Sequence, residues 1–88
     1  MPGRTTIFPN PVVDKAKLTL IGTAQNQQVT IQIMDAKGNP LTQQKIFLNP
    51  GSNAIELPIH PLWRSGVYFV RVITGDKVEL QKLVLQRR

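Results

Sequence analysis

Few side chains in this sequence are suited to catalysis. The one histidine, His60, stands between Ile59 and Pro61, with no serine, cysteine or carboxylate near it in the sequence. Proton transfer and nucleophilic attack both need a reactive group held beside an orienting partner. Ser52 and Ser65 adjoin glycines in turn-like segments, outside the nucleophile-elbow pattern. We therefore predict no catalytic residue and interpret His60 as a loop residue, a triad assembled from distant segments being the alternative.

The acidic residues and the absence of cysteine predict no metal or cofactor site. Five carboxylates are dispersed along the chain, at Asp14, Asp35, Glu56, Asp76 and Glu79. No pair among them has the spacing of a general acid and base. Residues 35–39 begin like a calcium loop, but Ala36, Lys37 and Gly38 supply no side-chain oxygen and no glutamate closes the loop. Without cysteine there is no disulfide and no thiolate ligand, so packing alone must hold the fold.

The chain is basic, but its positive charges are scattered. Eleven Lys and Arg against five Asp and Glu give a net charge of +6. The one modest concentration comprises Lys77, Lys82, Arg87 and Arg88. Nucleic-acid binders usually cluster their basic residues and interleave aromatic side chains for stacking. Neither feature is present, so we predict no nucleic-acid partner.

The length of 88 residues predicts a single domain, since two cores of half that size would bury too little surface. No apolar run approaches the roughly 18 residues that span a bilayer, and the first residues lack a signal-peptide pattern. We expect residues 1–6 to be a linker or a remnant of an expressed fragment, and residues 7–88 to be the folded domain.

Residues 65–74 form the longest strand-like run, and the other segments must be arranged around it. Successive side chains of a strand point to opposite faces. One face would carry Gly66, Tyr68, Val70 and Val72, and the other Val67, Phe69, Arg71 and Ile73. Because both faces are largely apolar, we predict a central strand that is partly covered on both sides.

Six further short strands are predicted from alternating apolar residues, at 5–8, 16–20, 29–33, 41–48, 55–57 and 77–86. Pro9, Asn10 and Pro11 end the first, which makes it an edge or a lead-in. Turns follow at residues 35–40, with Gly38, and at 49–52, with Gly51. The mixed composition of 41–48 favours an edge strand, and a change of apolar phase near residues 81–82 suggests a bulge or a bend.

Seven short strands at spacings of about ten residues predict an all-β fold, an immunoglobulin-like antiparallel β-sandwich of about seven strands. Its expected core comprises Leu18, Leu20, Val29, Ile31, Ile33, Ile55, Leu57, Tyr68, Val70 and Val72. Tyr68, two residues after Gly66, has the position of a tyrosine corner, whose hydroxyl bonds upstream backbone. For Trp63 we favour a packing role over an exposed contact.

Taken together, five motifs resemble the C-terminal sorting domain of cargo proteins of the bacterial type IX secretion system. The resemblance covers residues 7–88. Its motifs are Phe8-Pro9-Asn10-Pro11 with Asp14, Met34-Asp35-Ala36-Lys37-Gly38, Asn49-Pro50-Gly51-Ser52-Asn53, Ser65-Gly66-Val67-Tyr68-Phe69-Val70-Arg71-Val72, and Lys82-Leu83-Val84 near a basic C-terminus. Trp63 departs from the pattern, because the family often has leucine there.

The resemblance implies a non-catalytic domain at the end of a longer secreted protein. Such a domain folds in the periplasm and is bound by the outer-membrane translocon and its shuttle protein. A sortase-like cysteine protease then removes it N-terminal to residues 7–9, and the cargo becomes attached to the cell surface or is secreted. The chief alternative is a β-sandwich module for adhesion or carbohydrate binding, since this fold hosts many functions.

We further hypothesise that the last two strands form the surface read by the translocon or shuttle, through strand addition and charge. The residues assigned to this surface are Gly66, Tyr68, Val70, Lys82, Leu83, Val84, Arg87 and Arg88. The alternative is that these residues only complete the sheet. Pro9, Asn10, Pro11, Gly38 and Gly51 are assigned structural roles. Exposed edge strands also make a strand-exchanged homodimer plausible.

Overall fold

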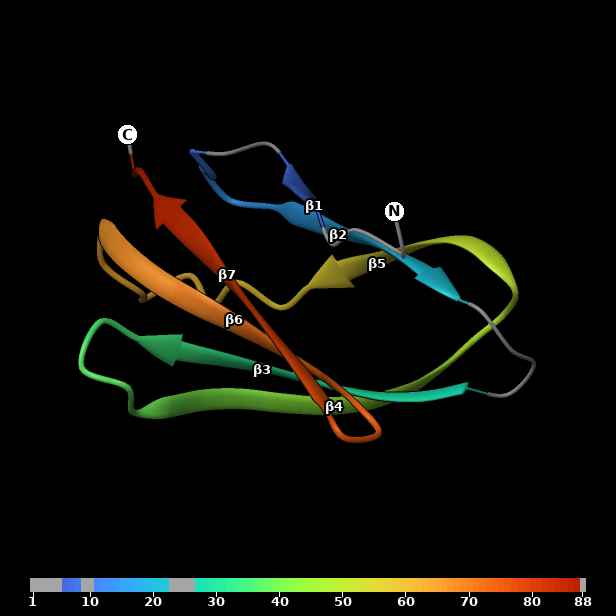
Figure 1. The fold of residues 1–88 in the computed structure, drawn as a ribbon. Coiled ribbons are helices and arrows are strands. Elements are labelled where there is room, and N and C mark those ends of the chain that lie inside the picture. Colours follow the sequence, from blue (N-terminus) through green and yellow to red (C-terminus); the bar gives the residue numbers. More distant parts are fainter. Residues whose placement is uncertain (1–5, 9–10, 23–26, 88) are drawn as a thin grey trace.

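The computed structural model describes residues 6–8, 11–22 and 27–87, which form seven strands in two facing sheets (Figure 1). The roles predicted for Pro9, Asn10, Arg88 and residues 1–5 concern positions that lie outside the described residues. The strands are β1 Thr6–Phe8, β2 Ala16–Gly22, β3 Gln27–Asp35, β4 Pro40–Leu48, β5 Gly51–Leu57, β6 Gly66–Thr74 and β7 Lys77–Leu85. No helix that could cross a membrane occurs in the described part of the chain.

The two sheets have the strand orders β1-β2-β5 and β4-β3-β6-β7, and every neighbouring pair of strands is antiparallel. This arrangement confirms the predicted all-β sandwich of about seven strands. β6 lies between β3 and β7, as expected for the central run at 65–74, while β1 and β4 lie at sheet edges, as also expected.

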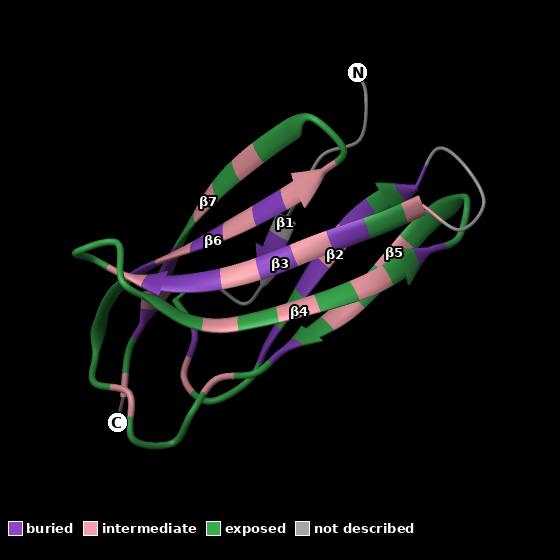
Figure 2. Ribbon diagram, turned by 90° about the horizontal axis from the view of Figure 1, so that it is seen from below, coloured by how far each residue is buried: buried purple, intermediate pink, exposed green. Residues whose placement is uncertain are grey.

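The core lies between the sheets and is built from aliphatic side chains. Nine of the ten predicted core residues belong to the buried cluster, and the tenth, Ile55, is partly buried against it. The cluster also contains residues that the sequence analysis did not assign to it, namely Ile7, Val12, Ala16, Leu48, Leu83 and Leu85. Burial alternates along β3 and β6 as the period of two requires (Figure 2).

The bulge predicted near residues 81–82 is wrong. β6 and β7 pair in one continuous register, from Gly66 opposite Leu85 to Thr74 opposite Lys77. Leu83 and Leu85 face the core, whereas Val78 and Leu80 lie on the outer face and are 61% and 56% exposed. The change of apolar phase therefore reflects a strand with apolar residues on both faces. The shift of register in this sheet occurs instead in β3, between Ile33 and Met34, where β3 pairs with β4.

Two glycines occupy the turns that were predicted to need them. Gly38, between β3 and β4, has φ 92°, and Gly51, at the start of β5, has φ 97°. L-residues with a side chain rarely adopt this left-handed region, whereas glycine enters it without steric cost. Both glycines therefore have the structural role assigned to them.

Segment 11–15, between β1 and β2, closes the sandwich against the last strand. Val12 is fully buried and forms a parallel bridge with Leu85. The Val12 amide donates to the Val84 carbonyl at 2.7 Å, and the Gln86 amide donates to the Val12 carbonyl at 2.7 Å. The C-terminal end of β7 is thus paired on both sides.

Candidate recognition surface

The β6–β7 hairpin has one face in the core and one facing solvent. Tyr68 is 9% exposed, and Val70 and Leu83 are fully buried. These three residues were assigned to the recognition surface, and their part in recognition stays a prediction. In the folded domain their side chains pack between the sheets and hold the hairpin in place.

The remaining assigned residues divide between the surface and the end of the hairpin. Gly66 and Lys82 are exposed, and Val84 is half-buried opposite Val67 in the register. Arg88 lies outside the described residues. Lys82 and Val84 share the outer face of β7 with Val78 and Leu80, which the sequence analysis did not assign.

Arg87 joins three separated segments of the chain. Its guanidinium donates to the backbone carbonyls of His60 at 2.6 Å, Trp63 at 3.0 Å and Val13 at 3.2 Å. Its backbone amide donates to the Ser65 Oγ atom at 2.8 Å. The fixed fork of donors in a guanidinium suits such multiple contacts. Arg87 therefore acts as a clamp on the segment between β5 and β6, and its side chain is committed to that contact.

The segment before β6 is fixed by the predicted tyrosine corner. The Tyr68 hydroxyl donates to the Arg64 carbonyl at 2.7 Å. The Trp63 ring stacks on the Tyr68 ring, with centroids 5.4 Å apart and an interplanar angle of 20°. Trp63 is half-buried against the core, which confirms the packing role expected for it. Together these contacts set where β6 begins.

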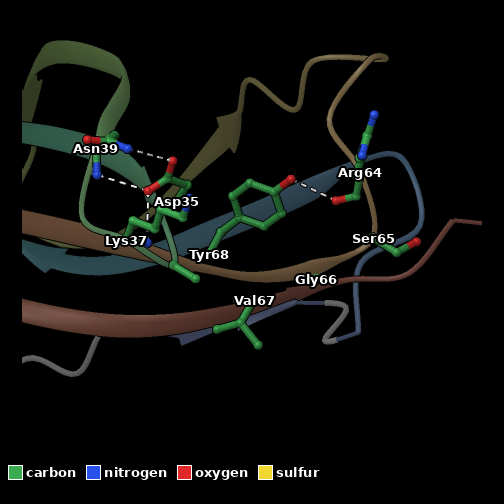
Figure 3. Close-up of a pocket in the computed structure, with 9 residues that line it drawn as sticks. Asp35, Lys37, Asn39, Arg64, Ser65, Gly66, Val67 and Tyr68 are labelled. Atoms are coloured by element: carbon green, nitrogen blue, oxygen red, sulfur yellow. Dashed lines mark hydrogen bonds between the residues drawn. The ribbon is translucent and has the colours of Figure 1, made fainter.

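A shallow pocket lies beside the start of β6, next to the turn between β3 and β4 (Figure 3). Its lining residues are Asp35, Ala36, Lys37, Asn39, Arg64, Ser65, Gly66, Val67 and Tyr68. In Figure 3, Tyr68 and Val67 project to opposite sides of β6, as the alternation of a strand requires. Of its polar groups, Asp35 and Asn39 bond within the turn, whereas Ser65 bonds the Arg87 amide and Tyr68 bonds the Arg64 carbonyl.

Asp35 organises that turn. Its Oδ1 atom accepts hydrogen bonds from the amides of Asn39 and Lys37, both at 2.9 Å, and its Oδ2 atom accepts one from the Asn39 side-chain amide at 3.2 Å. The Asn39 backbone bond is the main cause that lowers the pKa of the Asp35 carboxyl below its usual 3.8. The interpretation of residues 35–39 as a plain turn is confirmed.

Two of the candidate catalytic groups considered from the sequence, His60 and Ser65, accept hydrogen bonds from backbone amides. The His60 Nδ1 atom accepts from the Leu62 amide at 3.0 Å, and the Ser65 Oγ atom accepts from the Arg87 amide. Within the described ranges, no three His, Cys, Asp or Glu side chains come together as a metal site. In the hydrogen bonds described here, His60 and Ser65 each bond backbone rather than one another.

The features described so far define an immunoglobulin-like β-sandwich whose polar side chains mainly fix turns and segment ends. The chain belongs to the secretion system C-terminal sorting domain family, whose model matches residues 6–86. The resemblance to type IX sorting domains is therefore confirmed. As a member of this family, the domain is a secretion signal and not an enzyme, which implies contact with the secretion machinery and a route through the periplasm to the cell surface.

Two solved structures share the fold. A dimeric latent PorU from Porphyromonas gingivalis matches 98% of this chain with a TM-score of 0.71 and 16% identity. PorZ, a surface component of the type IX secretion system of the same organism, matches 94% with a TM-score of 0.66 and 20% identity. This chain spans only 9% of that PorU chain and 11% of that PorZ chain. Comparison with curated proteins gives no match.

Proposed function

We propose that this domain directs a cargo protein through the type IX outer-membrane translocon, with a shuttle protein binding it in transit. The observation that carries the proposal is the family match over residues 6–86, which covers all seven strands from the first residue of β1 to the last residue of β7. Hydrogen bonds from Arg87 to the backbone carbonyls of His60, Trp63 and Val13 hold the sandwich together, so the machinery would meet a folded domain.

Export of a reporter tests this proposal. The whole 88-residue chain is fused behind a reporter that carries a secretory signal, and the fusion is expressed in a bacterium with a type IX system and in a mutant lacking the translocon. We expect the reporter outside the first strain and inside the periplasm of the second. A folded fusion that stays in the periplasm of both strains, or leaves both equally, would contradict the proposal.

We also propose that a sortase-like cysteine protease removes the domain at the surface, by cutting N-terminal to Ile7. Support comes from the position of β1, which begins at Thr6 and pairs only with β2. Mass spectrometry of the surface-attached reporter should find its new C-terminus before Ile7, and cysteine-protease inhibitors should abolish that product. A C-terminus within β2 or beyond would contradict it.

A strand-exchanged homodimer is the further partner that we propose for high concentration. β1, β4, β5 and β7 each have one strand neighbour in the described sheets, so backbone edges are available for exchange. Size-exclusion chromatography across a concentration series should show a dimer fraction that rises with concentration. A monomer at every concentration would contradict it.

A further inference from the structure

Strand β4 is an edge strand that contains a buried hydrogen-bond donor without an acceptor. It has β3 as its one strand neighbour in the described residues, and it lies beyond β3 at the margin of the sheet (Figure 1). Gln44, the middle residue of β4, is half-buried and stands opposite Ile31 in the register. Its Nε2 atom is buried, and the part of the chain that the structure describes offers it no hydrogen-bond acceptor. Such a donor is costly to leave unpaired, so its position at an edge favours an acceptor from outside the domain.

The outward side chains of β4 are apolar near both ends of the strand and polar in its middle. Leu41 is 39% exposed and Phe47 is 68% exposed. Between them, Gln43 and Lys45 are also exposed, and Lys45 is the one charged residue of the strand. A strand that pairs with β4 must therefore bring apolar residues near its ends and an uncharged or acidic residue opposite Lys45.

An antiparallel copy of β4 has this pattern when a two-fold axis passes through Gln44. Such an axis pairs residues that share a face, so the inner and outer faces of the two sheets continue into one another. Leu41 then lies opposite the partner's Phe47, and Lys45 lies opposite the partner's Gln43. On the inner face, Gln44 lies opposite the partner's Gln44. The strand is thus complementary to itself in this register.

The neighbouring registers are less favourable. An axis through Lys45 would place this residue opposite its own copy, and like charges directly opposite each other destabilise a strand pair. An axis through Gln43 would place Phe47 opposite the partner's Asn39, which precedes β4. With the axis at Gln44, the two copies of Lys45 are diagonal neighbours about 7–8 Å apart. Their repulsion, like that between two chains with a net charge of +6 each, is screened by salt.

We propose that two copies of this domain pair through β4, antiparallel and centred on Gln44, and join their four-stranded sheets into one continuous sheet. The terminal torsion of a glutamine side chain is broad, so the Gln44 amide can turn until its Nε2 atom donates to the Oε1 atom of the partner's Gln44. This inference rests on the homodimer proposed above, but it pairs intact domains instead of exchanging a strand, and it names the strand and the register.

Substitutions at positions 41 and 47 test this register. Leu41→Glu puts a carboxylate opposite the partner's Phe47, and Phe47→Lys puts an ammonium group opposite the partner's Leu41. Each variant alone loses both apolar contacts between the two copies, whereas a mixture of the two variants keeps one contact and gains one ion pair. Leu62→Glu and Leu62→Lys, at an 82% exposed position outside the strands, are matched controls. Thermal unfolding of each purified chain verifies that the variants still fold.

Sedimentation velocity of the 88-residue chain, over a concentration series at low and at high salt, measures the dimer. We expect a dimer fraction of the unmodified chain that rises with concentration and with salt. Each variant of β4 should raise the dissociation constant by about tenfold or more, the effect of losing about 1.4 kcal/mol of binding free energy. The mixture should recover most of this loss, and the Leu62 controls should dimerise like the unmodified chain.

The outcomes separate this inference from the homodimer on which it rests. An unmodified chain that stays monomeric at every concentration and salt would overturn both. If the unmodified chain dimerises and the folded β4 variants dimerise equally well, the interface lies elsewhere and this inference fails alone. A mixture that dimerises no better than its components would overturn the register. In NMR spectra, the side-chain amide signals of Gln44 should shift as the dimer forms, and unchanged signals would contradict the hydrogen bond between the two glutamines.

Discussion

The two faces of the β6–β7 hairpin differ in what they do for the domain. The inner face buries Tyr68, Val70 and Leu83 between the sheets. The outer face leaves Val78 and Leu80 mostly in solvent, although these residues are just as apolar. The hairpin thus carries apolar residues on both faces, and only those on the inner face contribute to the core.

The difference between the two faces determines which residues of the motif at 65–72 a partner of the folded domain can contact. In residues 65–72, the alternate positions Tyr68, Val70 and Val72 are buried, so the motif is largely a description of the core. A receptor that binds the folded domain reaches Val67, Phe69 and Arg71 instead. The motif at 65–72 therefore contains two sets of residues on the same strand, one buried in the core and one on the outer face.

The largest effect should come from truncating an inner leucine of β7. Leu83 is fully buried, so Leu83→Ala removes core contacts and leaves a cavity, which costs about 2–5 kcal/mol. That is a large fraction of the roughly 5–15 kcal/mol typical of a domain. Urea unfolding followed by circular dichroism measures the loss.

Leu80 supplies the matched control, because it is the same residue type on the same strand, 56% exposed. Leu80→Ala should change the free energy of unfolding by no more than about 0.5 kcal/mol, as is usual for surface substitutions. Equal losses for the two variants would show that the faces do not differ in the way described.

A smaller but still large effect is expected where the hairpin ends. Arg87→Ala removes the donors to three backbone carbonyls, and we expect a loss of about 1–3 kcal/mol of stability, because hydrogen bonds that involve charged groups contribute more than neutral ones. Arg87→Lys should recover only part of this loss, since an ammonium group lacks the planar fork. Chemical unfolding of both variants provides the measurement; full recovery by lysine would mean that charge alone matters.

The fold was predicted from local sequence patterns, and the structure contains the elements that these patterns indicate. Alternation in β2, β3 and β6 identified their inward sides, and the glycine turns at Gly38 and Gly51 marked the reversals. These features depend on neighbouring residues, which is why a single sequence reveals them. The tyrosine corner at Tyr68 was equally accessible, because its hydroxyl bonds a residue only four positions away.

Features that depend on distant segments could not be predicted in the same way. The Arg87 guanidinium bonds Val13, 74 residues earlier, and Val12 pairs with Leu85 across the sandwich. Arg87 was instead assigned to a recognition surface, since a basic residue near a terminus gives no local signal of a clamp. The apolar residues on both faces of β7 were interpreted as a bulge, whereas the strand is regular and simply exposes Val78 and Leu80 to solvent.

Tyr68 allows the inner face to be divided into packing and hydrogen bonding. Tyr68→Phe keeps the stack on Trp63 but removes the hydroxyl that donates to the Arg64 carbonyl. We expect a loss of about 0.5–1.5 kcal/mol, the usual net contribution of one hydrogen bond. Thermal or urea unfolding measures it, and a loss as large as that of Leu83→Ala would place the importance of Tyr68 in the bond rather than in the core.

The smallest effect concerns the turn that adjoins this face, and it appears only in acid. Asp35 lies opposite Tyr68 in the β3–β6 register. Because the Asn39 backbone amide, above all, lowers the pKa of Asp35 in the folded chain below 3.8, the carboxylate binds protons less readily in the folded state than in the unfolded one. Its contribution to stability is present above the unfolded pKa and is lost as the pH falls through the folded pKa.

Asp35→Asn should therefore make the melting temperature depend less on pH in the acid range. The wild-type melting temperature should fall between about pH 5 and pH 2, whereas the variant, which has no proton to bind at this position, should fall less over the same range. Near neutral pH the variant should already be slightly less stable, because an amide oxygen accepts the Asn39 and Lys37 bonds more weakly than a carboxylate. Parallel acid limbs for both proteins would mean that the turn is held by Gly38 and the backbone rather than by the Asp35 charge.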